Sequence, residues 1–239
     1  GKLERTETSR DECQVEGLRR RPDTSCQSSA LINKLQDKEM GYKKPTQARA
    51  IATEQRFLNA LDECLREKSF DATSIVDIAE RAGLHRSAFL NRFGDKQQAL
   101  LVLFERYCDL VFDVVETLRS NIDAYKTLDA LCREMSSQLE QIQMAHFGAN
   151  RAMQEYFYQR LETHDMVKRI FLETVGLMKS AQQRFLDEPQ RTDQGAFAAT
   201  QLLVTLNFNY VMRGMPGLPK SSDDRHALIS KCMCAALTS

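Results

Sequence analysis

Apolar side chains recur at helical spacing along almost the whole chain from Thr53 onward. The first clear case is the stripe of Phe57, Leu58, Leu61 and Leu65, whose intervals place them on one face of a helix. Clusters of Gly, Pro, Asn and Asp interrupt the pattern at short intervals, as is typical of turns between helices. No segment has the alternation of a strand, so the sequence predicts an all-α fold.

The periodicity predicts helices at residues 54–67, 75–82, 86–92, 96–121, 125–143, 149–163, 166–187, 193–213 and 223–237. Residues before this series are polar and charged, although Leu31, Ile32 and Leu35 predict a short helix within residues 30–40. We therefore expect three parts. These are a polar N-terminal extension at 1–44, a small helical domain at 45–98 and a larger helical domain at 99–239.

Local signals within the small domain predict two short helices joined by a tight turn. Ser74 and Asp77 have the spacing of a reciprocal N-terminal cap, and Gly83 can take the left-handed conformation that ends a helix. Phe89 and Phe93, four residues apart, predict the buried face of the second helix. The other face then carries Arg86, Ser87, Leu90 and Asn91, with Arg92 at its edge.

Side chains of these types suit base edges and phosphates in a major groove. Two short helices with such a face make a helix-turn-helix, which predicts DNA binding. A buried helical hairpin with a solvated polar face is the other interpretation that this pattern allows.

The segment ATSxxDIAERAGLxRSAFxxRFGDKxxAL, residues 72–100, resembles the DNA-binding signature of the TetR/AcrR family. Upstream, KKPTQARAIATEQRFLNAL is similar to the lead-in and first helix of that family. The resemblance covers residues 45–105. It implies a three-helix helix-turn-helix DNA-binding domain, then a larger helical domain for effector binding and dimerisation. The expected function is a bacterial transcription regulator, more often a repressor, released from DNA by a small-molecule effector.

The resemblance implies roles for single positions. Phosphate contacts are expected from Thr73, Ser74, Arg92 and Lys96. Base contacts are expected from Arg86 and Ser87, with Leu90 and Asn91 on the same face. A basic arm before the first helix is expected to contain Lys43, Lys44 and Arg49.

Three departures from the family pattern bear on DNA recognition. Leu90 stands where many members have a phosphate-contacting Tyr, which favours contact with a thymine methyl instead. His85 replaces the usual Ser or Thr cap, and we interpret it as an exposed helix-start residue rather than a pH switch. Ser87 occupies a position that is often Gly. The operator sequence of a relative therefore cannot be transferred to this chain.

Composition and net charge say little about whether the chain binds DNA. Apolar residues make up 42% and charged residues 28%, which is ordinary for a globular protein. The 33 basic and 33 acidic residues give a formal net charge of zero, so DNA binding needs a local basic patch. Residues 84–96 supply a modest one, with Arg86, Arg92 and Lys96 against Asp95.

The segments 166–186 and 193–213 are apolar on more than one side. One side can serve the domain core while the other pairs with a second copy, so we predict a homodimer. The candidate contact residues are Phe171, Val175, Met178, Phe197, Leu202 and Leu206. Two recognition helices about one DNA turn apart would read a near-palindromic operator.

A pocket for an unidentified small-molecule effector is predicted where adaptable apolar groups mix with a few polar ones. Its candidate residues are Phe104, Tyr107, Met144, His146, Phe147, Asn150, Met153 and Phe157. Core packing explains the same residues equally well.

The seven cysteines are odd in number and lack CxxC spacing, which predicts a reduced setting and no metal site. Cys232 and Cys234 are interpreted as small buried hydrophobes. Redox sensing through Cys13, Cys26 or Cys108 is an alternative, although inert thiols are favoured because no basic surroundings are evident.

No apolar run approaches the ~20 residues that a membrane helix needs. The first residues also lack the hydrophobic region of a secretion signal, so a cytoplasmic protein is expected. HExxH, GxSxG and phosphate-binding glycine loops are missing from the sequence, which predicts no enzymatic activity and no cofactor. The main alternative to a regulator is a helical interaction protein that keeps a helix-turn-helix scaffold without specific DNA binding.

Overall fold

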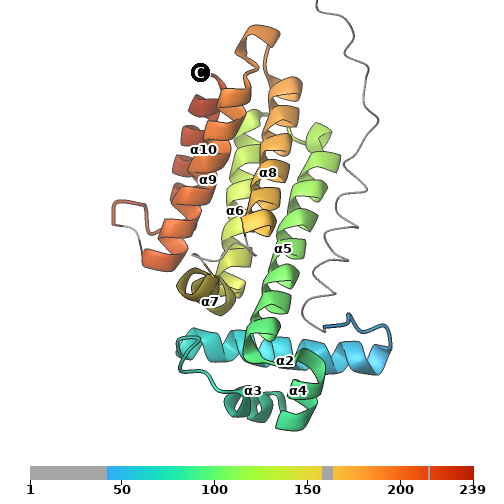
Figure 1. The fold of residues 1–239 in the computed structure, drawn as a ribbon. Helices are drawn as coiled ribbons and strands as arrows, with labels where there is room; N and C mark the ends of the chain where they lie inside the picture. The colour runs from blue at the N-terminus through green and yellow to red at the C-terminus, as the bar shows by residue number, and fades with distance from the viewer. Residues whose placement is uncertain (1–41, 158–163, 215) are drawn as a thin grey trace, which may run out of the picture. The chain divides into compact units, whose positions relative to one another are not determined.

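The computed structural model describes residues 42–157, 164–214 and 216–239, and within them the chain forms only helices (Figure 1). The predicted all-α fold is confirmed. The α-helices are α2 (Ala48–Glu67), α3 (Ile75–Ala82), α4 (Arg86–Phe93), α5 (Lys96–Ser120), α6 (Leu128–Ala145), α7 (Phe147–Phe157), α8 (His164–Phe185), α9 (Asp193–Arg213) and α10 (Ser222–Leu237). Two short 3-10 helices are η1 (Ile122–Ala124) and η3 (Glu188–Gln190).

The first residues of α2 and α6 differ from the predicted ones. Helix α2 begins at Ala48 instead of residue 54, and its first turn carries mostly exposed side chains. Helix α6 begins at Leu128, since the Thr127 hydroxyl accepts a hydrogen bond from the Ala130 amide at 3.2 Å. The helix predicted within residues 30–40 and the end of the one predicted at 149–163 lie outside the described residues.

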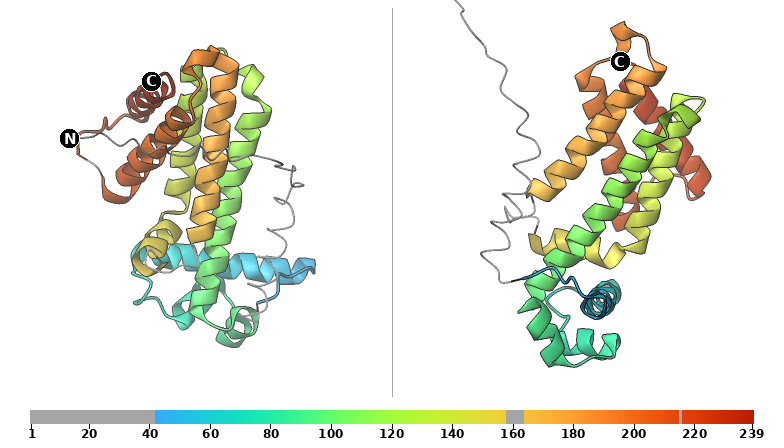
Figure 2. Two further views of the ribbon diagram at one scale, coloured as in Figure 1. Left: turned by 45° about the horizontal axis from the view of Figure 1, so that its top comes forward. Right: turned by 90° about the vertical axis from the view of Figure 1, so that its right-hand side faces the viewer.

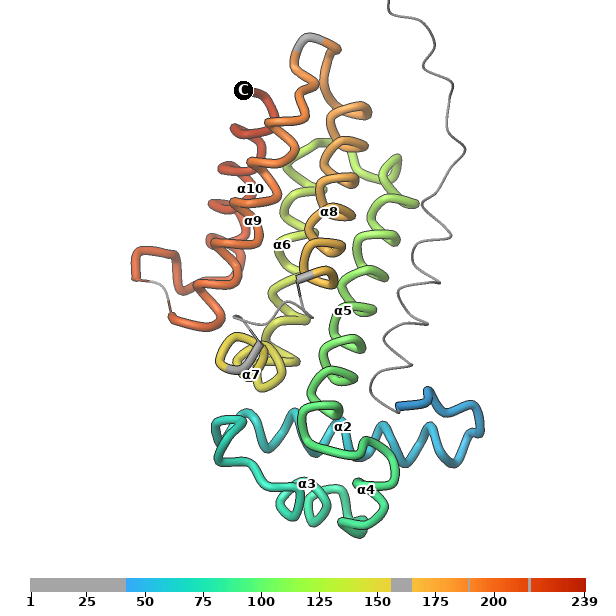
Figure 3. Tube along the Cα trace, viewed as in Figure 1, coloured from blue at the N-terminus to red at the C-terminus, as the bar shows by residue number. Residues whose placement is uncertain are grey.

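Helices α2, α3 and α4 pack around a small aromatic core at one end of the described unit (Figures 1 and 3). The Phe57 ring meets the Phe89 ring edge-on at 5.3 Å, and Phe89 lies 5.0 Å from Phe93. All three rings are buried, as is Ile78 of α3. Burial of each such side chain contributes about 1.5–3 kcal/mol, so α2, α3 and α4 are held together mainly by this core.

Helix α5 joins α2, α3 and α4 to the remaining helices. Its 25 residues span about 37 Å at 1.5 Å per residue. Leu100 and Leu103 are buried near its start, while Val111, Val115 and Leu118 are buried along its second half. Both views in Figure 2 show α5 running beside α6 and α8. Residues 42–239 form one compact unit by contact, and the boundary at residue 98 stays a prediction.

Helices α8 and α9 are the two long late helices that the sequence predicts. Val175 and Met178 of α8 are buried within this chain, so they are not available to a second copy as predicted. Phe197 of α9 is instead 53% exposed, and Val167 and Leu172 of α8 are similarly exposed. Among the described residues, no helix combines the length and apolarity needed to cross a bilayer.

Candidate nucleic-acid interface and effector cavity

The start and end of α3 are fixed by the residues that the sequence singles out. The Ser74 hydroxyl accepts the Asp77 amide at 3.1 Å, and the Ser74 amide donates to the Asp77 carboxylate at 2.8 Å. Hydrogen bonds that the Ser74 amide, the Ser74 hydroxyl and Lys68 donate to the Asp77 carboxylate lower its pKa to about 2. Gly83 ends the helix in the left-handed conformation with φ of 61°. The predicted capping box and turn are confirmed.

The turn between α3 and α4 is also tied to α2. The Arg56 guanidinium donates to the Ala82 carbonyl at 2.6 Å and to the Gly83 carbonyl at 3.2 Å. These carbonyls belong to the last turn of α3, which otherwise leaves them without helical partners. Sequence reasoning missed Arg56, because a single exposed Arg on α2 gives no local signal of this long-range contact.

Helix α4 presents the face expected for DNA. Phe89 and Phe93 point into the core, whereas Arg86, Ser87 and Asn91 are exposed. Within the described part of the chain these three polar side chains make no hydrogen bond or ion pair, so their donors are available to a ligand. Leu90 is half-buried at the edge of the same face.

His85 precedes α4 as an exposed N-cap whose side chain makes no capping hydrogen bond. This position agrees with its interpretation as a simple helix-start residue.

The basic arm lies against the end of α4. The Tyr42 ring stacks on Phe93 at 6.3 Å, and its hydroxyl donates to Glu54 at 2.8 Å. Burial and this hydrogen bond raise the pKa of Tyr42. The Arg92 guanidinium donates to the Lys43 carbonyl at 3.2 Å and lies 3.9 Å from the Glu54 carboxylate. Arg92 therefore holds the arm, and the exposed Lys43 side chain beside it extends the basic surface.

Two further members of the predicted set are exposed on or next to α2. Lys44 follows Lys43 in the arm. Arg49 lies in the first turn of α2 rather than before the helix, and its side chain is exposed. Together with Arg86, these side chains form the cationic part of the candidate interface. Sequence reasoning missed Tyr42 and Glu54, because aromatic and ionic contacts that position an arm depend on the folded chain.

Besides Arg92, which holds the arm, two predicted phosphate contacts are placed differently from the expectation. The Thr73 side chain is fully buried, and its hydroxyl donates to the Ser69 carbonyl at 2.9 Å. The Lys96 ammonium donates to the carbonyls of Phe70 at 2.6 Å and Thr73 at 2.8 Å. Burial lowers the pKa of Lys96. Both side chains therefore brace the loop before α3 instead of facing DNA, while Ser74 remains exposed.

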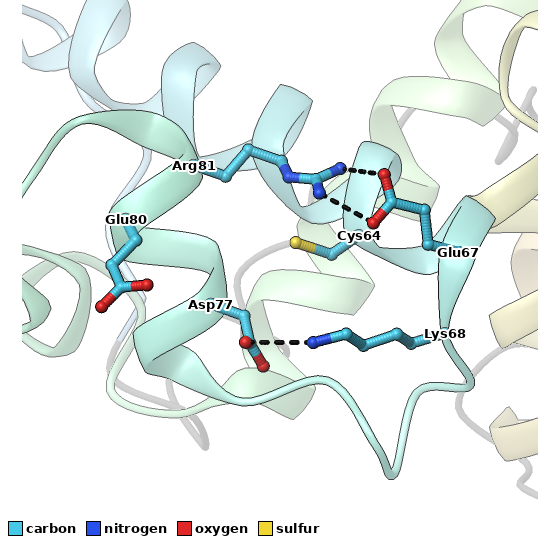
Figure 4. A pocket seen from close by; sticks show the side chains of 6 residues that line it. All are labelled: Cys64, Glu67, Lys68, Asp77, Glu80 and Arg81. Atoms are coloured by element: carbon cyan, nitrogen blue, oxygen red, sulfur yellow. Dashed lines mark hydrogen bonds and ion pairs between the residues drawn. The ribbon is translucent and has the colours of Figure 1, made fainter.

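A polar hollow of about 300 Å³ lies between α2 and α3 (Figure 4). Arg81 makes two hydrogen bonds of 2.8 Å to Glu67, and Lys68 lies 3.1 Å from Asp77. The cations of the hollow are thus already paired with its carboxylates. We interpret the hollow as a solvent-filled contact between α2 and α3 whose ion pairs orient α3. The described part of the chain contains no group of residues able to hold a metal ion.

A second, mostly apolar cavity of about 70 Å³ lies between α5, α6, α8 and α9. Its lining residues are Tyr107, Val111, Val114, Val115, Met135, Leu139, Gln143, Ile170, Thr174 and Val204. Gln143 is 3% exposed, and its side-chain oxygen Oε1 has no hydrogen-bond partner. A buried amide oxygen without a partner costs about 1–3 kcal/mol, so this cavity contains an acceptor that a ligand could satisfy.

Only Tyr107 of the predicted effector residues lines this cavity. Burial raises its pKa, against the opposing effect of the neighbouring Asn150 and Gln143 side chains. Phe104 stacks on Tyr107 at 5.8 Å, and Met153 is buried in the core. Met144 is 52% exposed and lies outside the cavity, which corrects its prediction as a lining residue.

The remaining candidates belong to α7 and the residue before it. The Phe147 ring lies 5.9 Å from the Arg151 guanidinium, and the Phe157 side chain lies outside the described set. His146 contacts the Asp62 carboxylate of α2 through its Nδ1 at 3.0 Å. The lining of this cavity comes from four helices, so no local pattern could have identified it.

The cavity region is connected to α2 through the start of α7. The Asp62 carboxylate accepts the Ala149 amide at 2.9 Å and contacts His146, whose ring lies 6.3 Å from the Tyr107 ring. The Arg66 guanidinium donates to the Met144 carbonyl at 3.1 Å. The end of α6 and the start of α7 are therefore both held against α2.

Residues 57–102 match the family model described as "Bacterial regulatory proteins, tetR family". This segment runs from the core of α2 to the first turns of α5, and the match confirms the predicted resemblance. No curated protein sequence matches the chain.

The fold is similar to solved structures of the same family. A putative TetR-family transcriptional regulator from Mesorhizobium loti MAFF303099 has a TM-score of 0.61 and 17% identity, covering 80% of this chain and 98% of that one. The fatty acid degradation regulator FadR from Bacillus halodurans has a TM-score of 0.59 and 14% identity, covering 81% and 97%. FadR from Bacillus subtilis, in complex with stearoyl-CoA, has a TM-score of 0.55 and 16% identity, covering 77% and 97%.

Proposed function

We propose that this chain, which carries a TetR-family helix-turn-helix on a TetR-like helical fold, is a DNA-binding transcription regulator that represses its targets. The observation that carries the proposal is the exposed face of α4, on which Arg86, Ser87 and Asn91 have no partner among the described residues. The opposite, aromatic face of α4 packs into the core. Such a helix can enter a major groove and present donors to base edges.

The residues around α4 divide into contacts that read bases and contacts that position the protein. Arg86, Ser87 and Asn91 are proposed to contact base edges, and Leu90 a thymine methyl. Phosphate contacts are assigned to the exposed Lys43, Lys44, Arg49 and Ser74 side chains, whose charges or donors flank the α4 face. A regulator of this kind would act in the cytoplasm, where bacterial DNA lies.

A homodimer would place two such faces on a near-palindromic operator. The supporting feature is the exposed apolar surface of α8 and α9, where Phe197 lies 4.8 Å from the Phe171 ring. Val167, one turn before Phe171, continues this surface along α8, whereas the exposed Leu172 lies about 100° further round the helix. Burying these groups against a second copy would remove several large apolar side chains from water.

The cavity is proposed to receive the effector. A cavity of about 70 Å³ is much smaller than the roughly 300–1,000 Å³ of sites for drug-sized ligands. A larger ligand must therefore spread the α5, α6 and α8 walls as it enters. Movement of α6 would reach α2 through His146 and Asp62 and would misplace α4, so a ligand that binds the spread state better releases the protein from DNA.

The chemistry of the cavity favours an apolar effector with one hydrogen-bond donor, which would pair with Gln143. We expect the variant Gln143→Leu to bind 1-hexanol about fivefold more weakly than the unchanged protein, because a lost hydrogen bond is worth about 1 kcal/mol. Titration calorimetry would measure this, with the exposed Gln201→Leu as control. Equal affinity of Gln143→Leu and unchanged protein would exclude Gln143 as the polar contact.

Selection of genomic fragments on the purified protein at moderate salt tests the proposed function. Enrichment of a near-palindromic motif, with sequences of fixed half-site spacing, is expected for a dimeric regulator. Retention of DNA without any shared motif, or no retention by a folded dimer, would instead favour a helical interaction protein that keeps the helix-turn-helix as a scaffold.

A further inference from the structure

Two cysteines that lie far apart in the sequence meet where α6 packs on α10. Cys132 of α6 is fully buried, and Cys234 of α10 is half-buried. The Ser230 hydroxyl, one turn before Cys234, donates to the Asp129 carboxylate at 2.7 Å and lies 4.0 Å from the Cys234 sulfur. Asp129 is itself one turn before Cys132. Across this contact the two thiols approach closely enough for each to shift the pKa of the other.

Charged groups around the pair differ for the two sulfurs. The Cys132 thiol, the Ser230 hydroxyl and Arg133 together lower the pKa of Cys234 to about 7, against the opposing effects of burial and Asp129. The neighbouring Cys234 thiol, together with burial, raises the pKa of Cys132. Arg133 is held in place by an ion pair with Asp129 at 2.6 Å. Cys234 is thus the more acidic thiol and also the more accessible one.

We propose that Cys132 and Cys234 are a redox site, which closes to a disulfide when the protein meets a hydroperoxide. The Cys234 thiolate attacks the outer peroxide oxygen, the O–O bond breaks, and the alkoxide leaves as an alcohol after taking a proton from water. The resulting sulfenic acid is attacked by the Cys132 sulfur, and the Cys132 proton leaves with the hydroxyl group as water. Two thiols are oxidised and one hydroperoxide is reduced to an alcohol and water.

The other described cysteines are either buried or point to a different side from Cys234. Cys64 and Cys108 are buried, and burial raises the pKa of both thiols, that of Cys108 to about 12. Cys232 is half-buried, but two residues along a helix it points to a different side from Cys234. Cys13 and Cys26 lie outside the described residues. Cys232 therefore serves as a matched control for Cys234.

A disulfide at this position would constrain the wall of the effector cavity. Helix α6 contributes Met135, Leu139 and Gln143 to that cavity, and α10 packs along the same helix. Tying α6 to α10 would hinder the spreading that a ligand requires. This consequence rests on the proposed function, whereas formation of the disulfide does not.

Peptide mapping of the full chain tests the site without any DNA. The reduced protein is treated with a small molar excess of hydrogen peroxide, alkylated under denaturing conditions and digested with trypsin. Cleavage after Lys126, Arg133 and Lys231 separates residues 127–133 from residues 232–239. We expect these two peptides linked by a disulfide in the unchanged protein and in Cys232→Ser, and unlinked in Cys234→Ser.

Several results would overturn the proposal. A link that persists in Cys234→Ser and disappears in Cys232→Ser would assign the chemistry to the wrong cysteine. Full alkylation of both cysteines after peroxide treatment would show that the site does not react. Oxidation of Cys234 to a sulfinic acid without any link would exclude Cys132 as the resolving thiol. Circular dichroism melting of each variant ensures that a missing link does not reflect a missing fold.

Discussion

Replacing Arg86 by alanine is expected to weaken operator binding of the homodimer by at least about 30-fold. Each copy loses one direct base contact worth about 1–3 kcal/mol, and about 1.4 kcal/mol corresponds to tenfold in affinity. Because Arg86 is exposed and has no partner among the described residues, its removal leaves the fold of α4 unchanged. The loss should therefore appear in binding and not in stability.

Fluorescence anisotropy with the selected operator, measured at several salt concentrations, would quantify this loss. Lys126→Ala is the matched control, since it also removes one exposed positive charge but lies beyond the far end of the 25-residue helix α5. The control should bind almost as the unchanged protein does. If Arg86→Ala stays within twofold of this control at every salt concentration, Arg86 does not contact the bases.

Base readout also predicts how specificity changes in the same experiment. Without Arg86 the protein should discriminate less at one operator position in each half-site, while its residual affinity keeps its salt dependence. Loss of a phosphate contact such as Lys44 would instead weaken all sequences alike and reduce the salt dependence. The two patterns separate the proposed roles of residues that carry the same charge.

The helix-turn-helix could be predicted from the sequence because its determinants are local. Ser74 and Asp77 are three residues apart, Gly83 follows its helix directly, and Phe89 and Phe93 share one helical face. The residues that make up each signal lie within one or two helical turns of one another. The tertiary packing is consistent with these local preferences.

The role of Lys96 could not be predicted from local sequence signals. A lysine after the second helix fits a phosphate contact by type and position, yet its ammonium caps two carbonyls of the loop before α3. Those carbonyls converge on Lys96 only once α5 has packed against α2. The cavity is a similar case, since its lining comes from four helices, and so is the pair formed by Cys132 and Cys234. Contacts between distant segments leave no trace in periodicity or spacing.

Replacing Gly148 by alanine is expected to lower the free energy of unfolding by about 3 kcal/mol, near the upper end of the usual cost of overpacking. Gly148 is the second residue of α7 and lies directly on the backbone of α2. A Cβ there would overlap the Asp62 carbonyl oxygen and lie 2.9 Å from the Arg66 amide nitrogen. Both are main-chain atoms inside a helix, so neither can move aside without shifting α2 against α7.

Differential scanning calorimetry should show a melting temperature lowered by about 6–12 °C, given about 2–4 °C per kcal/mol for a chain of this size. Gly176→Ala is the control, because it makes the same substitution in α8. Its Cβ would meet only the flexible Arg119 guanidinium at 3.2 Å, and alanine favours a helix by up to about 1 kcal/mol. If both variants melt together, the close approach at Gly148 does not hold α7 on α2.

The same substitution tests whether this contact transmits the effector signal. Moving α7 away from α2 would break the hydrogen bond between the Ala149 amide and Asp62, together with the contact of Asp62 with His146. At a temperature where Gly148→Ala remains folded, a ligand in the cavity should then no longer change its affinity for operator DNA. An effector response equal to that of Gly176→Ala would show that the signal reaches α4 by another route, through α5.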